Sequence, residues 1–236
     1  MDKVIHRSGE RGYADHGWLK SYHSFSFAGY YDPEKVNFGA LRVLNDDSVA
    51  PGKGFGMHPH ENMEIISIPL SGELEHKDNM GNATVIRTGD VQIMSAGTGV
   101  KHSEFNHSKS EPVKFFQIWV FPKEKNIQPR YDQRTFDIAG RINQWQLVVA
   151  PGPSEQTVTI NQDAWFSLGN PQKGTALDYK LNKPGNGVYL FVIEGSVEVT
   201  GETLQRRDAI GLDNLSEVKV NATSDSQLLL MEIPMK

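Results

Sequence analysis

The sequence of 236 residues predicts an all-β fold made of two tandem β-barrels or jelly rolls. Three observations support this fold class. First, 22 glycines and 12 prolines interrupt the chain at short intervals, and helix signals are scarce. Second, short runs of β-branched and aromatic residues lie between these interruptions, at a spacing typical of a sandwich or barrel. Third, the order of segments in the first half recurs in the second half.

The expected strands follow the apolar runs along the chain. A short segment of sequence Asn-Met-Gly-Asn, residues 79–82, lies between two such runs and predicts a hairpin turn. The polar segment 122–143 carries two prolines and is expected to connect the two halves. The strands are expected over residues 64–70, 84–87, 91–94, 113–121, 146–149, 157–160, 188–193, 197–200, 217–220 and 227–233.

An internal repeat indicates where the two barrels lie. Residues 66–75 and 87–91 correspond to residues 189–198 and 206–210. In each copy an apolar strand meets a glycine turn, then come an alternating strand, a charged turn that ends in Asp, and a second apolar strand. Tandem duplication explains this order, and chance similarity among β-rich segments is the alternative. We therefore expect an N-terminal domain over residues 1–130 and a C-terminal domain over residues 131–236.

Composition excludes several classes of protein. The net charge of −5 provides no general attraction to nucleic acid or to an anionic membrane. The absence of cysteine excludes disulfides, iron–sulfur clusters, thiolate zinc sites and cysteine nucleophiles. The N-terminal residues include no apolar run typical of a secretory signal, and no stretch is long enough to predict a membrane span. We expect a cytoplasmic protein with no direct nucleic-acid or membrane partner, and the sequence reveals no surface for a protein partner.

Histidines suggest a metal site in the first half, because all eight precede residue 108. On a strand, residues i and i+2 point to the same face, so His58 and His60 project together, as do His102 and Glu104. If the two strands are neighbours, three imidazoles and one carboxylate suit Fe(II), Mn, Ni, Cu or Zn. Four such ligands leave two positions open on an octahedral ion. Exposed histidines in a turn are the alternative explanation for either pair alone.

Two further sets of residues bear on this metal site: Glu64 and the remaining five histidines. Glu64 continues the parity of His58 and His60, so it is an alternative carboxylate ligand, or it orients a ligand from behind. We expect the remaining histidines not to bind the ion. They are His76 and His107, expected to be solvated, and His6, His16 and His23, expected in the core or on the surface.

The histidine segments resemble the two motifs of cupins. Residues 52–64 contain a glycine, five residues, His-x-His, three residues and a glutamate, as in the first cupin motif. Residues 89–106 are similar to the second motif, with two departures. Ser95 stands where a proline is usual, and two extra residues precede His102.

The altered second motif, with Glu104 two residues after His102, resembles that of the pirin family. Segments 15–19, 22–27 and 38–47 also resemble bacterial pirins. This resemblance covers most of the first half and extends to the second only in outline. It implies a bicupin, in which two cupin barrels follow one another and only the first retains histidine ligands.

The resemblance also implies a ligand set and an activity. Pirins usually hold one iron ion through four residues, which correspond here to His58, His60, His102 and Glu104. Glu64 then becomes part of the wall around the site. Similar bacterial members are associated with quercetin 2,3-dioxygenase activity. In that reaction the flavonol binds the metal through its 3-oxygen, dioxygen adds, and the ring opens with loss of carbon monoxide. Glu104 would be the base for the flavonol hydroxyl.

Two other functions remain open. The chain could be a metal-binding regulatory module or redox sensor that interacts with a protein partner, since eukaryotic pirins are linked to transcription factors. It could also be a cupin with promiscuous oxygenase activity and another physiological substrate. An enzyme needs an apolar pocket, which Phe55, Met57 and residues 115–119 could line. These residues could equally be ordinary core, because the run around 113–121 is apolar on both faces.

Overall fold

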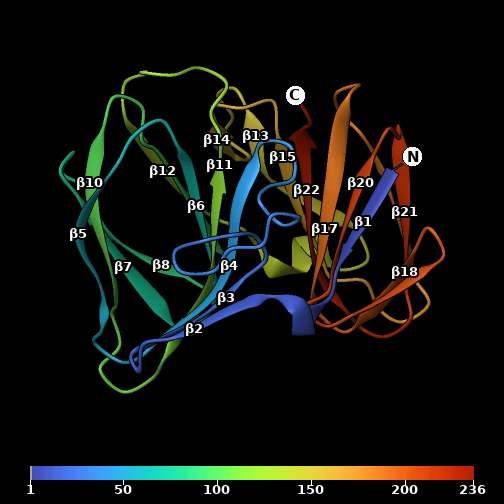
Figure 1. Cartoon of the computed structure of the whole chain (residues 1–236), viewed down its shortest axis with the longest axis horizontal. Helices are drawn as coiled ribbons and strands as arrows, with labels where there is room; N and C mark the ends of the chain where they lie inside the picture. The colour runs from blue at the N-terminus through green and yellow to red at the C-terminus, as the bar shows by residue number, and fades with distance from the viewer. Residues whose placement is uncertain (1) are drawn as a thin grey trace.

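Two β-barrels lie side by side in the computed structural model, which describes residues 2–236 (Figure 1). Each barrel combines one seven-stranded and one four-stranded sheet. The only helical turns between residues 2 and 236 are two 3-10 turns, η1 (Ser8–Glu10) and η2 (Ile138–Arg141). The all-β prediction is therefore confirmed. Within the same range, no helix has the length and apolar character needed to cross a membrane.

The first barrel carries the histidine segments. Its seven-stranded sheet has the spatial order β12 (Arg130–Thr135), β9 (Asp90–Ser95), β6 (Glu64–Ser71), β11 (Val113–Val120), β4 (Leu41–Val49), β3 (Leu19–His23) and β2 (Gly12–Asp15). Its four-stranded sheet has the order β5 (Gly54–His60), β10 (Val100–Asn106), β7 (Glu73–Asp78) and β8 (Ala83–Arg87).

The second barrel repeats this arrangement. Its seven-stranded sheet has the order β1 (Asp2–His6), β20 (Ala209–Asp213), β17 (Asn186–Glu194), β22 (Gln227–Pro234), β15 (Trp165–Gly169), β13 (Trp145–Pro151) and β14 (Val158–Ile160). Its four-stranded sheet has the order β16 (Ala176–Lys180), β21 (Glu217–Ala222), β18 (Ser196–Val199) and β19 (Glu202–Gln205). Strand β1 thus joins the second barrel, although it precedes the first in sequence.

The predicted hairpin at residues 79–82 connects β7 to β8. A carboxylate oxygen of Asp78 accepts hydrogen bonds from the backbone N–H groups of Met80 and Asn82, at 2.9 and 3.0 Å. Gly81 has a φ of 99°, a conformation that side chains rarely adopt. The segment expected as a connection contains β12, which pairs with β9 of the first barrel. A domain boundary between residues 130 and 131 remains a prediction.

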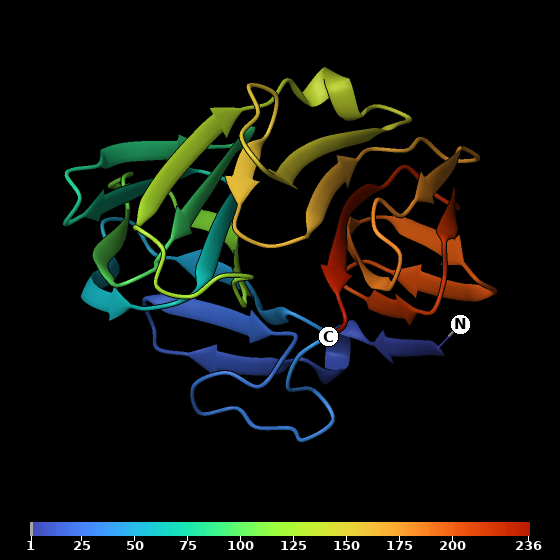
Figure 2. The same ribbon diagram turned by 90° about the horizontal axis from the view of Figure 1, so that it is seen from above.

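The two barrels share one apolar core between their seven-stranded sheets (Figure 2). Alternate residues of β6, β9 and β22, among other strands, enter it, and the rings of Phe116 and Phe191 meet there at 5.3 Å between centroids. The interior of the second barrel is filled by a separate cluster of buried valines, leucines and isoleucines, with Tyr179. In the first barrel, residues 2–236 form two small apolar clusters in the interior, which leave room for a cavity.

Candidate metal centre

Neighbouring strands bring the two histidine segments together. Strands β5 and β10 are antiparallel, and His58 lies directly opposite His102. Gly54 permits this close pairing, because a Cβ atom there would lie 2.2 Å from the backbone oxygen of Glu104. The pairing changes register between His102 and Glu104, since Glu104 lies opposite Phe55. Strand β5 therefore has one extra residue, and this β-bulge turns Phe55 and His58 toward the same cavity.

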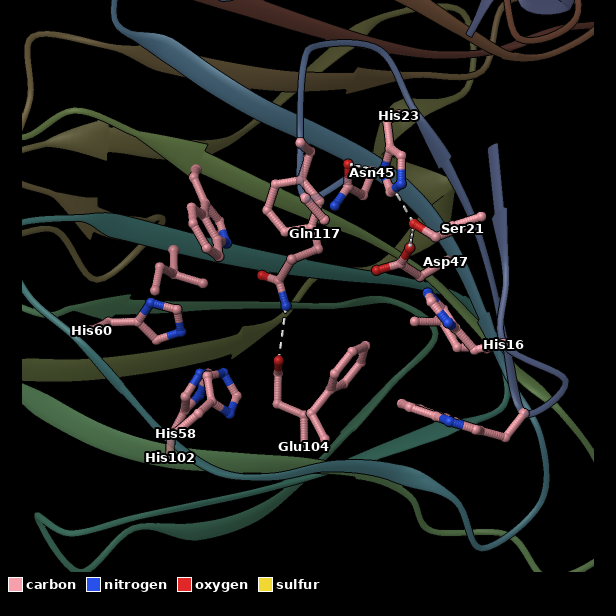
Figure 3. Close-up of a pocket in the computed structure, with 18 residues that line it drawn as sticks. His16, Ser21, His23, Asn45, Asp47, His58, His60, His102, Glu104 and Gln117 are labelled. Carbon is pink, nitrogen blue, oxygen red and sulfur yellow. Dashed lines mark hydrogen bonds between the residues drawn. The ribbon is translucent and has the colours of Figure 1, made fainter. Parts of the chain in front are cut away.

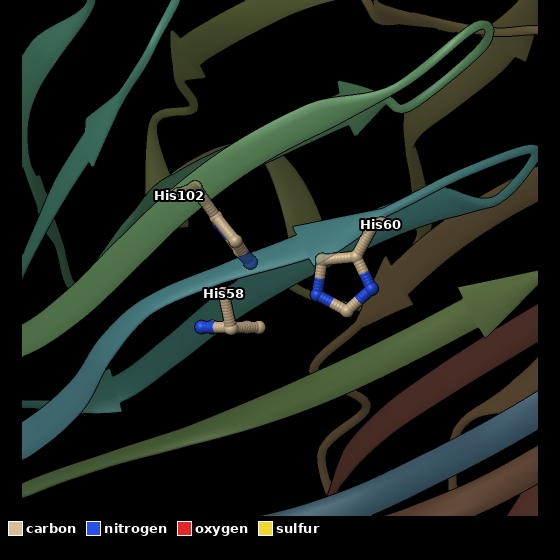
Figure 4. Close-up of side chains that lie close together, drawn as sticks. All are labelled: His58, His60 and His102. Carbon is tan, nitrogen blue, oxygen red and sulfur yellow. The ribbon is translucent and has the colours of Figure 1, made fainter.

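Three histidines, His58, His60 and His102, form a cluster that fits a metal ion (Figure 4). Their ligand atoms lie within 4.8 Å of one another. Nδ1 of His58 donates to the carbonyl oxygen of Gly56 at 2.7 Å, which leaves its Nε2 with a free lone pair. Nε2 of His102 is buried and has no hydrogen-bond partner. A bound ion would satisfy this atom, because imidazole nitrogen is a good ligand for divalent transition metals.

The histidines of this cluster are kept unprotonated, which favours metal binding. Burial, reinforced by the neighbouring histidines, lowers the pKa of His60 to about 4 and that of His102 to about 3. Both rings are therefore neutral near pH 7 and offer lone pairs without first losing a proton.

A buried pair of side chains, His76 and Asp78, lies behind His102, and the sequence did not predict it. His76 was expected to be solvated, but this prediction is wrong, because its side chain is 0% exposed. Its Nδ1 lies 3.5 Å from Nδ1 of His102, and its Nε2 lies 3.0 Å from a carboxylate oxygen of Asp78. Since Asp78 accepts from Nε2, Nδ1 of His76 accepts from His102, and Nε2 of His102 remains free to bind a metal. Alternation along β7, where Leu74 is buried and Lys77 is exposed, is the signal that places His76 inside.

His76→Phe should weaken metal binding about 10–100-fold, because groups that orient a ligating imidazole have effects of about this size. Phenylalanine keeps the buried ring but removes the acceptor for Nδ1 of His102. Titration calorimetry with nickel(II) measures the change. His107→Ala is the matched control, because His107 is exposed and its imidazole lies beside the acidic side chains of Glu73 and Glu75 on β7, away from the cavity. Equal affinities for the two variants would exclude the orienting role.

Glu104, the predicted fourth ligand, is buried beside the histidines. One oxygen accepts from Nε2 of Gln117 at 2.8 Å, and the other accepts from the hydroxyl of Ser67 at 3.2 Å. Glu104 forms a second group able to hold a metal with His76 and His102. The two groups share His102, so Glu104 lies next to the three-histidine cluster. Its coordination of an ion stays a prediction.

Glu64, the alternative carboxylate, occupies a different position. One oxygen accepts from the hydroxyl of Ser95 at 2.7 Å and from the backbone N–H of Asn161 at 3.0 Å. It therefore bonds to the second half of the chain. Residues 61–63 separate β5 from β6, and Asn62 has a φ of 48°, so the parity of His58 and His60 does not continue to Glu64. Between residues 2 and 236, Glu64 belongs to neither group able to hold a metal.

A cavity of about 420 Å³ opens beside the histidine cluster (Figure 3). This volume lies within the range of about 300–1,000 Å³ typical of small-molecule sites. Two edge-to-face aromatic pairs line it, Trp18 with Phe55 at 5.3 Å and Phe27 with Trp119 at 5.4 Å between ring centroids. Such walls suit a flat aromatic ligand.

The predicted pocket wall is correct in part. Phe55 and the β11 residues Gln117 and Trp119 line the cavity. Met57 does not line it and is 57% exposed, because it follows the alternation of the strand and lies on the face opposite His58. The other predicted members pack in apolar cores: Phe115 inside the first barrel, and Phe116 and Ile118 between the sheets.

Comparisons with known proteins cover nearly the whole chain. Residues 5–120 match the family model "Pirin", and residues 147–233 match the model "Quercetinase C-terminal cupin domain". The chain is 40% identical over 235 residues to a quercetin 2,3-dioxygenase of Escherichia coli K12, covering 98% of each protein. The crystal structure of YhhW from Escherichia coli aligns with a TM-score of 0.94 at 39% identity, over 99% of this chain and 98% of that one. The structure of bacterial pirin YhhW with nickel(II) aligns with a TM-score of 0.93 at 39% identity, over 99% of both chains.

Proposed function

Because this chain belongs to the pirin family, we propose that it is a metal-dependent dioxygenase that opens the flavonol ring of quercetin-type substrates. Several relatives carry the name quercetin 2,3-dioxygenase, and the second barrel matches a quercetinase model. The observation that carries the proposal is the convergence of His58, His60 and His102 beside an apolar cavity. An open metal position next to aromatic walls is what a reaction between a flat phenol and dioxygen requires.

We assign one divalent transition metal to each chain, held by His58, His60, His102 and Glu104. Iron(II) is the ion we propose in the cell, with nickel, copper, manganese and zinc as competitors, because imidazole and carboxylate ligands accept all of them. A relative that was crystallised with nickel(II) supports binding of a divalent ion at this kind of site. When bound, the ion would act as a Lewis acid toward the substrate oxygen.

The chain's own residues would bind and deprotonate the substrate. The aromatic walls would hold the flat flavonol and exclude water from the reacting ring. Glu104 would accept the proton of the 3-hydroxyl group, which requires hydrogen-bond contact with that group. The amide of Gln117 and the hydroxyl of Ser67 hold both carboxylate oxygens of Glu104 in place. In the overall reaction, one quercetin and one dioxygen would be converted to the ring-opened ester and one carbon monoxide.

The test is steady-state turnover of quercetin by protein loaded separately with iron(II), nickel(II), copper(II) or manganese(II). We expect oxygen uptake and loss of flavonol absorbance in equal amounts, with release of carbon monoxide, at rates above those of the free metal. Rates no higher than free metal for every ion would contradict the enzyme. The metal-binding regulatory module would then be the better explanation. The cytoplasmic location remains a prediction.

A further inference from the structure

A second polar cluster lines the same cavity, away from the histidines (Figure 3). It consists of Ser21 and His23 on β3 and Asn45 and Asp47 on β4, and we call it the polar quartet. Ser21 lies directly opposite Asp47, and His23 lies directly opposite Asn45. Each pair therefore projects to the inner face of the sheet. All four residues are buried, with exposures of 3% for Ser21, His23 and Asn45 and 4% for Asp47.

Hydrogen bonds within the quartet leave several polar atoms without a protein partner. The hydroxyl of Ser21 donates to Oδ1 of Asp47. Nδ1 of His23 lies 2.8 Å from Oδ1 of Asn45 and 3.3 Å from the hydroxyl of Ser21. Among residues 2–236, no hydrogen bond is formed by Oδ2 of Asp47, the amide nitrogen of Asn45 or Nε2 of His23. The three residues line the cavity, so a ligand or water there is the partner available to these atoms.

The quartet is connected to the metal centre by a row of polar side chains. Gln117 on β11 lies directly opposite Asn45 on one side and Ser67 on the other. Gln117 and Ser67 both bond to Glu104. In the second barrel the position that corresponds to Gln117 is Leu230, which lies between Ser167 and Leu190. The amide that connects the row to Glu104 is therefore present in the barrel that holds the histidines and replaced by an apolar side chain in the other.

We propose that the polar quartet binds hydroxyl groups on the part of the aromatic substrate that lies away from the metal. This inference rests on the proposed function. It predicts that the enzyme prefers polyhydroxylated flavonols over flavonols without further ring hydroxyls. Phenolic hydroxyls both donate and accept hydrogen bonds, and the free atoms of the quartet include both acceptors and an amide donor. Bidentate contact by Asn45 and Asp47, two residues apart on one strand face, suits a pair of such groups.

Electrostatics agrees with this assignment. Burial raises the pKa of Asp47 to about 7, with the charge of Glu104 as a further cause. The carboxyl group is thus partly protonated near neutral pH. In that state it donates to a phenolic oxygen, and in the ionised state it accepts from a phenolic hydroxyl.

Two flavonols separate recognition by the quartet from chemistry at the metal. Quercetin carries hydroxyls on its outer rings, whereas 3-hydroxyflavone retains only the hydroxyl assigned to the metal. We expect the metal-loaded protein to prefer quercetin in kcat/KM. Asp47→Ala and Asn45→Ala should each lower kcat/KM for quercetin about tenfold, the effect of losing one or two hydrogen bonds. Both variants should leave kcat/KM for 3-hydroxyflavone unchanged, which a general structural defect would not do.

The controls distinguish the possible failures. Ser167→Ala changes a buried strand serine of the second barrel that does not line the cavity, so it should leave both substrates unaffected. Equal effects of Asp47→Ala on both flavonols, or no effect on either, would overturn the role of the quartet while the enzyme assignment stands. If the wild-type protein turns over neither flavonol, the proposed function fails. Dissociation constants from anaerobic fluorescence quenching then decide the quartet's role, since they need no turnover.

Discussion

His102→Ala is expected to lose the metal ion and all flavonol turnover while keeping its fold. The imidazole of His102 belongs to both groups of side chains able to hold a metal, and its Nε2 is buried without another partner. Metal affinity should fall by more than about 100-fold, because changes in groups that only orient a ligand already cost about 10–100-fold. The fold should persist, since the second barrel keeps the same framework and, among the described residues, holds no group of histidines able to bind a metal.

Elemental analysis and thermal unfolding test this expectation on the same samples. The wild-type protein should carry one metal ion per chain, and the variant almost none. Circular dichroism of the two metal-free proteins should show the same β-sheet spectrum. Retention of metal by His102→Ala would mean that the ion is bound elsewhere. Two ions per wild-type chain, with the second in the C-terminal half, would contradict a single site in the first barrel.

Glu104→Gln should lower kcat for quercetin by about 10²–10⁴-fold, the usual contribution of a general base. Glutamine has nearly the same shape, and its carbonyl oxygen can still accept from the amide of Gln117. The second side-chain atom becomes an amide donor, which the hydroxyl of Ser67 can accept. The substitution therefore removes the charge and the proton acceptor with little disturbance of packing. Initial rates of flavonol loss at saturating substrate measure the effect.

Glu64→Gln provides the matched control, because it removes another buried carboxylate from the same barrel. Glu64 bonds to Ser95 and to the backbone of Asn161, so its loss should affect stability more than metal content. We expect Glu104→Gln to bind metal more weakly and Glu64→Gln to keep both metal and activity, so kcat is compared with metal added to saturation. If Glu64→Gln loses more metal than Glu104→Gln, the carboxylate ligand is Glu64, the glutamate of the first cupin motif.

Period-two alternation made the barrels and the histidine cluster predictable. His58 and His60 share a strand face whatever the partner strand is, and the repeat between the halves predicted two similar barrels. The pairing of β5 with β10 then brings His102 opposite His58. This last step depends on contacts between distant segments, and the sequence suggested it only through the spacing of the two motifs.

Other parts of the site depend on details that alternation does not reveal. Strand β11 is apolar on both faces, because one face enters the core between the barrels and the other lines the cavity. Alternation from His58 places both Met57 and Phe55 on the outer face, and only the extra residue in β5 turns Phe55 into the cavity. The polar quartet lies on β3 and β4, which were absent from the predicted strands because polar residues interrupt their apolar pattern.

The pairing of β1 with β20 has a consequence for biosynthesis. Ile5 pairs with Ile210, so an early segment of the chain finds its partner only after most of the protein has left the ribosome. Until then β1 has no strand beside it, although β2 and β3 can already join the first barrel. Contacts between such distant segments form late and slow the final stage of folding. The second barrel is therefore completed by β1, which is synthesised before the rest of either barrel. The first barrel can fold while the second barrel, to which it is linked, is still incomplete.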